Sequence, residues 1–483
     1  MSLKENHNHK ILLERLKTTK PILLIPVENQ VRELDAKILL ACVAAQRGFV
    51  SVLGPRRELE FRIASFPKAI YLSKGLKSGN GRFFKILHKI GIDVVAWDEE
   101  ALVHLPPESY FSHRFSSIAL QNVTHLFAWG QDNADLWKQH HGLAQKIQIH
   151  VTGNPRGDLL RPELHKFYER AVQEIQEIYG NFILINTNFN VVNAFYPVQN
   201  LFQPANKSGD EPKLGRSGRN MNREYAKVFQ GHKQSIFEDF QQLIPSLEQA
   251  FPDYTIVVRP HPGENQKIYH KIAAQCKRVR VNGEGSVVPW LKATKALIHN
   301  GCTTGVEAYA MGVPTVTYRA TVNKYWDYVY HNLPNQLSYQ CFNFEQLRET
   351  LQKILNGELG AADGDERKKL IKRHLAAQDG PLACERIVDV LEKIVNNHFE
   401  SENIDFKARL KGRYLLIRRS VRKRYRSLLP SSHKKPELQH HNYPGISHSE
   451  MCSAISKFQL LLGYDRQELK AEEISDQIYK ISN

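Results

Sequence analysis

Short apolar runs alternate with amphipathic stretches along the first third of the chain. Apolar runs fall at residues 22–27, 50–53, 69–72, 94–97, 125–129 and 147–152. Between them, stretches such as 32–47 and 81–90 carry apolar residues at helical spacing. Strands that alternate with helices in this way are typical of βαβ units, which build parallel sheets. The pattern predicts a Rossmann-like domain over residues 18–158, which ends in the turn-forming segment 152–158.

The same alternation then starts again. A helical pattern at 165–179 is followed by apolar runs at 182–186, 255–258, 279–281, 296–299 and 315–318. Helical patterns fill two of the gaps, at 234–250 and 344–355. We expect a hinge helix over 159–180 and a second Rossmann-like domain over 181–398. The predicted fold class is α/β, with two Rossmann-type parallel-sheet domains that face a cleft.

Residues 190–232 interrupt this pattern. The segment is long, polar and rich in glycine, lysine and arginine. Such loops in compact domains are usually either functional or disordered. It follows the first strand of the second domain, so it emerges at the edge of the sheet where ligands bind. A substrate-facing loop and a flexible insertion are equally good interpretations.

The last segment, 399–483, is predicted to be a basic helical tail. Ten lysines and arginines lie between Phe406 and Leu428, interleaved with leucine, isoleucine and tyrosine. A basic amphipathic helix favours an anionic membrane surface. A solvated helix packed on the body is the second interpretation, and a nucleic-acid-binding arm is the third. Residues 445–481 show helical apolar spacing, which indicates a small helical module.

Composition narrows the class of protein. The chain has 483 residues, 42% of them hydrophobic, and a formal net charge of +16, which favours an acidic partner. Its six cysteines form no C-x-x-C pair, which argues against a zinc ribbon or a disulfide framework. The polar N-terminus has no signal core, and no apolar run is long enough to span a bilayer. We expect a cytoplasmic protein, with any membrane contact peripheral and on the inner face.

Two strand ends in the second domain carry groups suited to an anion. The run 296–299 leads through a polar turn to Thr303 and Thr304, where a helix begins. The free N–H groups and the positive dipole of a helix start bind phosphates. Arg259 and His261 follow another strand and face the same crevice if the two strands are neighbours. Together these residues predict a site for a nucleotide phosphate.

Each of these residues also has a simpler interpretation. His261 stands between two prolines, which hold it rigidly for phosphate contact or leaving-group protonation, or leave it bonded to a carbonyl. Asn186 and Thr187 could contact the phosphate or a sugar of the ligand, or they could form an Asx turn. Thr304 and Glu307 have the spacing of a capping box.

Carboxylates near two strand ends of the first domain are candidates for catalysis. A carboxylate placed beside a bound substrate can act as a general base or as a nucleophile. Glu28, Glu33 and Asp35 follow the first strand, and Asp98, Glu99 and Glu100 follow the fourth. We expect Glu99 or Glu100 to act in the chemistry, with Glu33 next, although adjacent acids are often solvated surface charge. No His/Cys cluster or Walker loop is present, so we expect neither a metal nor a cofactor.

These motifs occur in an order that resembles a known family. Residues 22 to about 394 resemble the bacterial surface carbohydrate biosynthesis protein family of the GT-B glycosyltransferase superfamily. The resemblance is carried by the segments Pro26–Glu28 with Arg32–Lys37, Ala44–Gly48, Ala96–Leu102, Thr152–Arg156, Ile183–Phe189, the His-Pro motif and the Thr-Thr segment. The His-Pro and hydroxyl-pair arrangement is similar to that of sialyltransferases, Kdo transferases and teichoic-acid glycerophosphotransferases, which use CMP- or CDP-activated donors.

The resemblance implies roles for individual residues and a function. His261, Thr303 and Thr304 would hold the nucleotide phosphate, and Glu307 would bind the ribose hydroxyls. The glycines of the turn, among them Gly305, would let the ligand approach the backbone closely.

The expected activity is transfer of a sugar, with a CMP-linked acidic sugar as one candidate donor, to a glycan or lipid-linked acceptor in surface polysaccharide biosynthesis. No nucleic acid is expected as a partner. The alternatives are a UDP-N-acetylglucosamine 2-epimerase-like enzyme, a polyol-phosphate transferase and a non-catalytic basic scaffold.

Overall fold

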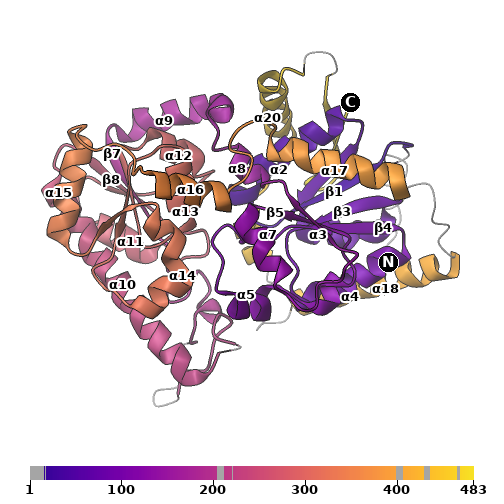
Figure 1. Cartoon of the computed structure of the whole chain (residues 1–483), viewed down its shortest axis with the longest axis horizontal. Coiled ribbons are helices and arrows are strands. Elements are labelled where there is room, and N and C mark those ends of the chain that lie inside the picture. Colours follow the sequence, from indigo (N-terminus) through magenta and orange to yellow (C-terminus); the bar gives the residue numbers. More distant parts are fainter. Residues whose placement is uncertain are drawn as a thin grey trace. The chain divides into compact units, whose positions relative to one another are not determined.

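The computed structural model describes residues 16, 18–203, 211–219, 221–398, 406–428, 436–464 and 468–483. The chain forms two compact units (Figure 1). Unit 1 comprises residues 1–167 and 372–483, and unit 2 comprises residues 168–371. Unit 1 thus combines the expected first domain with residues 372–398 and with the tail. The start of the chain and residues 399–405, on which parts of the expected tail and terminus fall, lie outside the described residues.

Unit 1 is built on an eight-stranded sheet with the strand order β13-β14-β2-β1-β3-β4-β5-β6. The six N-terminal strands are parallel. These strands are β1 (Ile22–Val27), β2 (Val50–Pro55), β3 (Ala69–Ser73), β4 (Ile92–Ala96), β5 (His125–Ala128) and β6 (Gln148–Val151). Burial follows the expected pattern, since every residue of β1 and β3 is buried. The strands predicted from the apolar runs are confirmed to within two residues at each end.

The helices of unit 1 connect and cover these strands. In the N-terminal part they are α2 (Gln30–Gln46), α3 (Arg56–Arg62), η1 (Ile63–Ser65), α4 (Ser78–Lys89), α5 (Pro107–Arg114), α6 (Ser117–Leu120), α7 (Gln131–Lys138), α8 (Pro155–Asp158) and η2 (Pro162–Tyr168). In the C-terminal part they are α17 (Ala383–His398), α18 (Phe406–Ser427), α19 (Pro436–Asn442) and α20 (His448–Leu461). The core between sheet and helices includes Leu24, Val52 and Val94.

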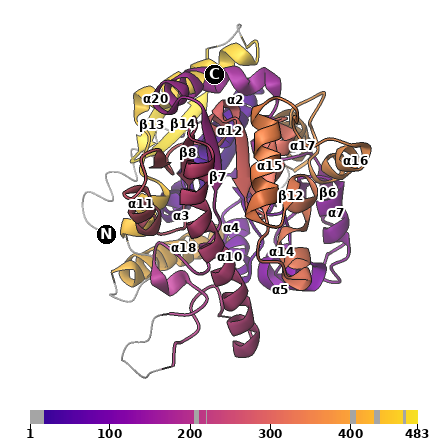
Figure 2. The same cartoon turned by 90° about the vertical axis from the view of Figure 1, so that its left-hand side faces the viewer.

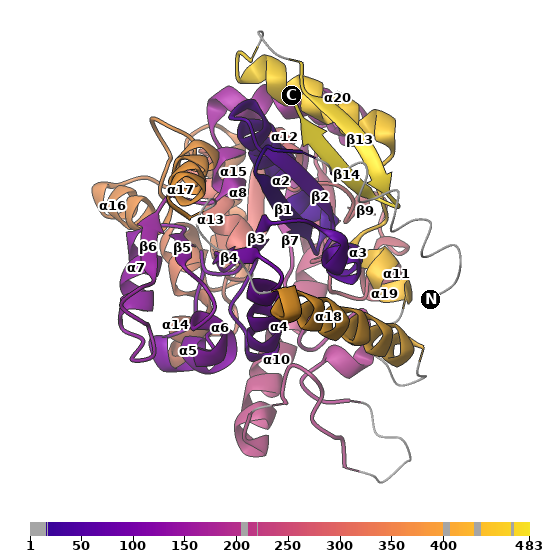
Figure 3. The same cartoon turned by 90° about the vertical axis from the view of Figure 1, so that its right-hand side faces the viewer.

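The end of the chain corrects one prediction. Residues 445–481 are not wholly helical: after α20 they form an antiparallel hairpin of β13 (Lys470–Ser475) and β14 (Ile478–Ser482). β14 pairs antiparallel with β2 and extends the sheet, as Figure 3 shows. Pairing with β2 buries Ile478, Tyr479 and Ile481, so the strand is stabilised by a partner more than 400 residues away.

Unit 2 is built on a six-stranded parallel sheet with the order β12-β11-β10-β7-β8-β9. Its strands are β7 (Phe182–Asn186), β8 (Thr255–Arg259), β9 (Val279–Val281), β10 (Ala296–His299), β11 (Thr315–Tyr318) and β12 (Tyr339–Cys341). The predicted α/β class with two Rossmann-type parallel sheets is therefore confirmed. The strands that end in Arg259 and His299 are not direct neighbours, because β7 lies between them.

Helices flank this second sheet, and the long helix α10, which packs against β8 and β9, lies at the front of Figure 2. They are α9 (Glu169–Tyr179), η3 (Pro197–Gln199), α10 (Arg223–Ala250), α11 (Lys267–Ala273), α12 (Val288–Ala293), α13 (Thr303–Ala310), α14 (Lys324–Gln336), α15 (Phe344–Leu355) and α16 (Asp365–His374), the last of which ends in unit 1.

α10 begins eleven residues earlier than the apolar pattern indicated, so the expected loop 190–232 ends in helix. Asn222 caps α10 by accepting from the N–H groups of Glu224 and Tyr225. No helix in the described ranges is long and apolar enough to cross a membrane.

Candidate active site

The carboxyl end of the unit 2 sheet contains a topological switch point. β7 is the first strand of the unit, and the chain continues on one side through β8 and on the other through β10. In open α/β sheets, ligands bind in the crevice outside the strand ends at such a point. The register places Asn186 of β7 opposite both Arg259 of β8 and His299 of β10. The residues predicted to bind a phosphate therefore belong to three adjacent strand ends.

Three polar atoms at this edge are buried and have no hydrogen-bond partner among the described residues. They are Oδ1 of Asn186, Oδ1 of Asn300 and Oγ1 of Thr304. Buried polar atoms in proteins are nearly always hydrogen-bonded, so an unpaired group needs an explanation such as a water or a ligand. Three of them on the ends of β7 and β10 and in the first turn of α13 favour a polar ligand at the switch point.

The turn between β10 and α13 is built around His299. This side chain is fully buried, its Nδ1 accepts from the N–H groups of Gly301 and Cys302, and its Nε2 lies 2.9 Å from the Ser338 hydroxyl. Burial lowers the pKa of His299 to about 3, so the ring is neutral. Gly301 has φ +82°, a conformation that favours glycine. His299 therefore fixes the loop that leads to the helix start.

The structure gives a steric reason for the glycine at position 305. A Cβ at this position would lie 2.4 Å from Nε2 of His299. The missing side chain thus makes room for the buried imidazole, and the expectation that Gly305 lets a ligand approach the backbone stays a prediction. Gly305 contributes to the site by letting α13 start close to β10.

The start of α13 also differs in detail from the capping-box interpretation. The helix begins at Thr303 as predicted, but its N-cap is Cys302, and no side chain caps it. Thr304 is therefore the second residue of the helix, and its hydroxyl is unpaired instead of capping. Thr303 is partly exposed, and Glu307 is buried. The capping box is thus wrong, and the Thr304 hydroxyl remains available to a ligand.

His261 has a defined tautomer. The N–H of Gly263 donates to Nδ1 of His261 at 3.0 Å, so this nitrogen carries no proton and Nε2 carries it in the neutral ring. An imidazole held in this way presents Nε2 as a hydrogen-bond donor, which suits a phosphate oxygen. We therefore expect Nε2 to be the atom of His261 that contacts the phosphate.

Glu264 organises this edge and was missed from the sequence. It is fully buried, and its Oε1 accepts from the Thr187 hydroxyl, the Phe189 N–H and the His261 N–H. Its Oε2 accepts from the Tyr269 hydroxyl at 2.6 Å. Burial raises the pKa of Glu264 to about 7 against these hydrogen bonds. The only sequence signal is an acid three residues after the histidine of a His-Pro motif.

Thr187, which the sequence predicted to contact the ligand, belongs to the hydrogen-bond network of Glu264. Its hydroxyl donates to Glu264 and lies 3.3 Å from the Tyr269 hydroxyl, and the residue is buried. Thr187 therefore links β7 to the turn that contains His261. Of the two neighbours Asn186 and Thr187, Asn186 alone has an unpaired side-chain atom.

Arg259 also acts on a neighbouring loop. Its guanidinium donates to the carbonyls of Glu284, at 2.7 Å, and Gly285, and lies 5.4 Å from the centroid of the Trp290 ring. Burial lowers its pKa to about 10, so it remains a cation at neutral pH. The geometry gives Arg259 a positioning role for the loop 282–286, together with a positive charge near the strand ends.

A buried lysine adds a second cation that was not predicted. Lys233 of α10 is only 4% exposed, and its Nζ lies 5.9 Å from the centroid of the Phe229 ring. Burial lowers its pKa to about 8, while the charges of Asp327 and Cys302 act in the opposite direction. Cys302, the N-cap of α13, is thus among the groups that act on the pKa of Lys233. The sequence signal that could have identified Lys233 is a lysine within the apolar stripe of a predicted helix.

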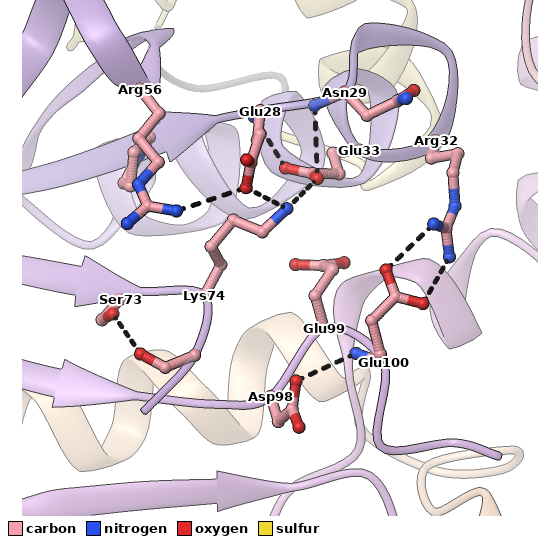
Figure 4. A network of polar contacts seen from close by, with 12 residues as sticks. Glu28, Asn29, Arg32, Glu33, Arg56, Ser73, Lys74, Asp98, Glu99 and Glu100 are labelled. Atoms are coloured by element: carbon pink, nitrogen blue, oxygen red, sulfur yellow. Dashed lines mark hydrogen bonds and ion pairs between the residues drawn. The ribbon is translucent and has the colours of Figure 1, made fainter. Parts of the chain in front are cut away.

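The carboxyl edge of the unit 1 sheet is different, because its charges are paired. Figure 4 shows this network. Glu33 is buried and accepts from the N–H of Glu28 and from the ammonium groups of Lys37 and Lys74. Burial favours a raised pKa, but the two lysines outweigh burial and hold the pKa of Glu33 well below its usual range. A carboxylate with these donors is a poor general base.

The other carboxylates differ in how firmly they are bound. Glu100 forms a bidentate pair with Arg32 at 2.9 and 3.0 Å, which outweighs burial and holds its pKa well below its usual range. Asp98 is buried and accepts from the Tyr110 hydroxyl at 2.9 Å. Both therefore have structural partners.

Among the candidate carboxylates of unit 1, Glu99 has the longest ion pairs, slightly longer than the 3.7 Å between Asp98 and Arg114. It accepts from the Trp97 indole N–H at 2.8 Å, while its distances to Lys37 and Arg156 are 3.8 and 3.9 Å. The remaining candidates, Glu28 and Asp35, are exposed and half-buried. Glu28 pairs with Arg56 and Lys74. Among the residues that the structure describes, no group of histidines, cysteines and acids is arranged to hold a metal ion.

Comparison with known proteins gives likenesses of fold. No family model matches the chain, and no curated protein matches it. The resemblance to the surface carbohydrate biosynthesis family therefore stays a prediction. Among solved structures, the chain is similar to the wall teichoic acid polymerase TagF, with 10% identity, a TM-score of 0.48, and coverage of 82% of this chain and 95% of that one.

It is also similar to two other proteins. One is the UDP-GlcNAc 2-epimerase of Neisseria meningitidis bound to UDP-GlcNAc, with 12% identity, a TM-score of 0.45, and coverage of 77% of this chain and 100% of that one. The other is S. aureus MnaA in complex with UDP, with 13% identity, a TM-score of 0.46, and coverage of 80% and 99%. At these values the likenesses concern the fold, and the chemistry of the site is argued from its own residues.

Proposed function

We propose that the chain is a glycosyltransferase that moves a sugar from a nucleotide-activated donor to a glycan or lipid-linked acceptor of a surface polysaccharide. The observation that carries the proposal is the set of unpaired buried polar atoms at the β7–β10 switch point. These atoms belong to Asn186, Asn300 and Thr304. A phosphate and a sugar hydroxyl together supply the acceptors and donors that such atoms lack.

In this proposal, unit 2 binds the donor. The Nε2–H of His261 and the Thr304 hydroxyl donate to the phosphate oxygens, and the positive end of the α13 dipole favours the same charge. Lys233 supplies a further positive charge from α10. As the bond between the anomeric carbon and the phosphate oxygen breaks, negative charge grows on that oxygen. Fixed donors at that position stabilise the leaving group.

The acceptor hydroxyl needs a base, and we assign that role to Glu99 of unit 1. The carboxylates of Glu33 and Glu100 are held by strong cationic partners, whereas the ion pairs of Glu99 are longer than 3.5 Å. The acceptor oxygen forms the new bond to the anomeric carbon, and its proton passes to the carboxylate. Glu99 remains a proposal that turnover measurements test.

The first experiment is a thermal-shift panel of CMP, CDP, UDP, GDP and ADP. We expect one base class to raise the melting temperature of the wild type, because a ligand that binds only the folded state stabilises it. The shift should be lost in His261→Ala and kept in the matched control His270→Ala, an exposed histidine of α11 in the same unit. Cytidine selectivity favours transfer of an acidic sugar or a polyol phosphate, and uridine selectivity favours ordinary sugar transfer or epimerisation.

Two further results separate the alternatives. Consumption of a nucleotide sugar without any acceptor indicates an epimerase or a hydrolase, and a phosphodiester product indicates a polyol-phosphate transferase. If no nucleotide shifts the wild type, the donor site is refuted and a non-catalytic scaffold becomes the better explanation.

A further inference from the structure

The basic helix α18 is attached to unit 1 by a face of small residues. Its buried residues are Gly412, Leu416, Ser420 and Ser427, which recur at helical spacing. This face packs against α4 and α3, and Figure 3 shows α18 running across α4. A Cβ at position 412 would lie 2.7 Å from Ile90, so the glycine permits a close approach of the two helices. α18 is thus a packed part of the unit.

A buried ion cluster fixes how α18 is rotated about its axis. Glu60 of α3 is 2% exposed and accepts from Arg419 at 2.9 Å and Lys423 at 2.7 Å, both on α18. Arg56 donates to the same carboxylate at 2.8 Å. The Arg419 guanidinium also lies 4.0 Å from the centroid of the Phe83 ring. Leaving Glu60 unpaired is costly, so the cluster holds one rotation of the helix.

This rotation turns the apolar side of α18 away from the protein. Seven large apolar residues are between 38% and 76% exposed: Phe406, Leu410, Tyr414, Ile417, Val421, Tyr425 and Leu428. Their spacing of three and four residues confines them to about 100° of the helix circumference. Helices packed on a protein normally bury such a stripe. A contiguous exposed apolar stripe of this kind indicates a surface that another phase or molecule covers.

Cations flank the stripe. The exposed ones are Lys407, Lys411, Arg418, Arg422 and Arg426, together with Arg424, whose guanidinium lies 5.2 Å from the Phe61 ring centroid of α3. The segment 406–428 contains no acidic residue. A nucleic acid requires cations and can stack on the three aromatic residues of the stripe, but it makes no use of the four exposed aliphatic residues Leu410, Ile417, Val421 and Leu428. An anionic bilayer surface complements both features, because its headgroups attract the cations and its acyl boundary accepts the apolar side chains.

We propose that the outward face of α18 is a membrane-binding surface that lies in the plane of an anionic bilayer. The seven apolar residues enter the headgroup–acyl boundary, and the flanking lysines and arginines contact lipid phosphates. The buried face stays attached to α3 and α4, so unit 1 meets the membrane in one orientation. The inference is independent of the proposed transferase activity, because it concerns residues outside both sheet edges.

The test is co-sedimentation of the full-length protein with vesicles of phosphatidylcholine alone and with phosphatidylglycerol added, over a series of salt concentrations. Wild type should bind only the anionic vesicles. Leu410→Ser with Val421→Ser should weaken binding about tenfold or more by removing stripe area. Lys411→Gln, Arg418→Gln and Arg422→Gln together should weaken it on the order of 100-fold, from about 1 kcal/mol for each cation.

A matched control removes three exposed lysines elsewhere, as Lys353→Gln, Lys369→Gln and Lys372→Gln. It makes the same change in net charge and should bind as the wild type does. Equal losses in the control and in the α18 charge variant would refute a specific surface. Unchanged binding of the stripe variant would show that the cations act alone, as in nucleic-acid binding, and would overturn the proposal, as would a wild type that does not sediment with anionic vesicles.

Circular dichroism and nucleotide thermal shifts, measured on the same preparations, distinguish lost membrane binding from lost folding or from a failed donor site.

Discussion

The carboxyl edges of the two sheets differ in how their buried polar groups are paired. In unit 1 the edge is filled by ion pairs, and the Glu33 carboxylate accepts hydrogen bonds from two lysines and from the backbone. In unit 2 the corresponding edge has unpaired oxygens on Asn186, Asn300 and Thr304. Unit 1 also has unpaired buried side-chain atoms after its strands, on Asn29, Asn133 and Asn154. The two edges therefore differ in their ion pairs, and unpaired groups at either edge gain stability when a ligand arrives. The comparison favours unit 2 as the side that binds the donor, because a ligand at its edge meets no network of carboxylates already paired with lysines and arginines.

The largest expected effect is on turnover, and it tests whether one acid of unit 1 acts as a general base. Glu99→Gln should lower turnover by about 100-fold or more, because a general base contributes a factor of roughly 10²–10⁴. Nucleotide binding should stay within about twofold, because Glu99 belongs to unit 1. The comparison variant is Glu100→Gln, whose carboxylate is held by Arg32. A larger loss in Glu100→Gln than in Glu99→Gln would reverse the assignment.

The next effect contrasts the stability of the two edges. Glu33→Ala should cost about 3–5 kcal/mol of unfolding free energy, because it leaves the buried ammonium of Lys37 without its closest carboxylate. Urea denaturation measures the loss. Glu174→Ala, which removes an exposed ion pair on α9, should change the same quantity by no more than about 0.5 kcal/mol. A Glu33→Ala variant as stable as that control would contradict the view that the unit 1 network is structural.

The third effect is pH dependence from Glu264. The pKa of this carboxyl is raised from 4.5 to about 7 in the folded chain. Between these values the unfolded state releases the proton first, so the contribution of Glu264 to stability falls as pH rises from 4.5 to 7. The full change is about 3 kcal/mol, from 1.36 kcal/mol for each pKa unit.

Comparing unfolding free energies of wild type and Glu264→Gln at several pH values isolates this contribution. The glutamine variant keeps an acceptor for Thr187 and should lack this fall in stability. Parallel pH profiles for the two proteins would show that Glu264 does not titrate in this range.

The smallest effect is expected at the open edge. Thr304→Val removes a hydroxyl that has no partner, so the stability of the protein without ligand should change by less than about 1 kcal/mol or increase. Nucleotide affinity should fall about tenfold, as for the loss of one hydrogen bond to a charged group. Calorimetric titration with the nucleotide that the thermal-shift panel selects measures the second quantity. Destabilisation of the unliganded variant without any change in affinity would assign Thr304 a structural role.

The sequence predicted only those parts of the candidate site that depend on residues close together in the chain. The start of α13 at Thr303 follows from an apolar strand, a polar turn and a glycine with positive φ, all within eight residues. Glu264 and Lys233 could not be found in the same way, because their surroundings come from residues distant in sequence. Glu264 is hydrogen-bonded to Thr187, which is 77 residues away. Lys233 contacts Phe229 of its own helix, but Asp327 and Cys302, which act on its pKa, belong to other segments.

The sequence by itself determined the α/β class, the extent of most strands and the helix start that precedes the anion site, because apolar periodicity and turn chemistry act over a few residues. Only the tertiary structure decided which polar groups are satisfied, because hydrogen bonding depends on neighbours brought together by the sheet. It placed β7 between the strands that end in Arg259 and His299, turned Gly305 toward His299, and gave β14 the partner that makes it a strand. It also decided the rotation of α18, since the Glu60 cluster holds the helix with its apolar stripe outward.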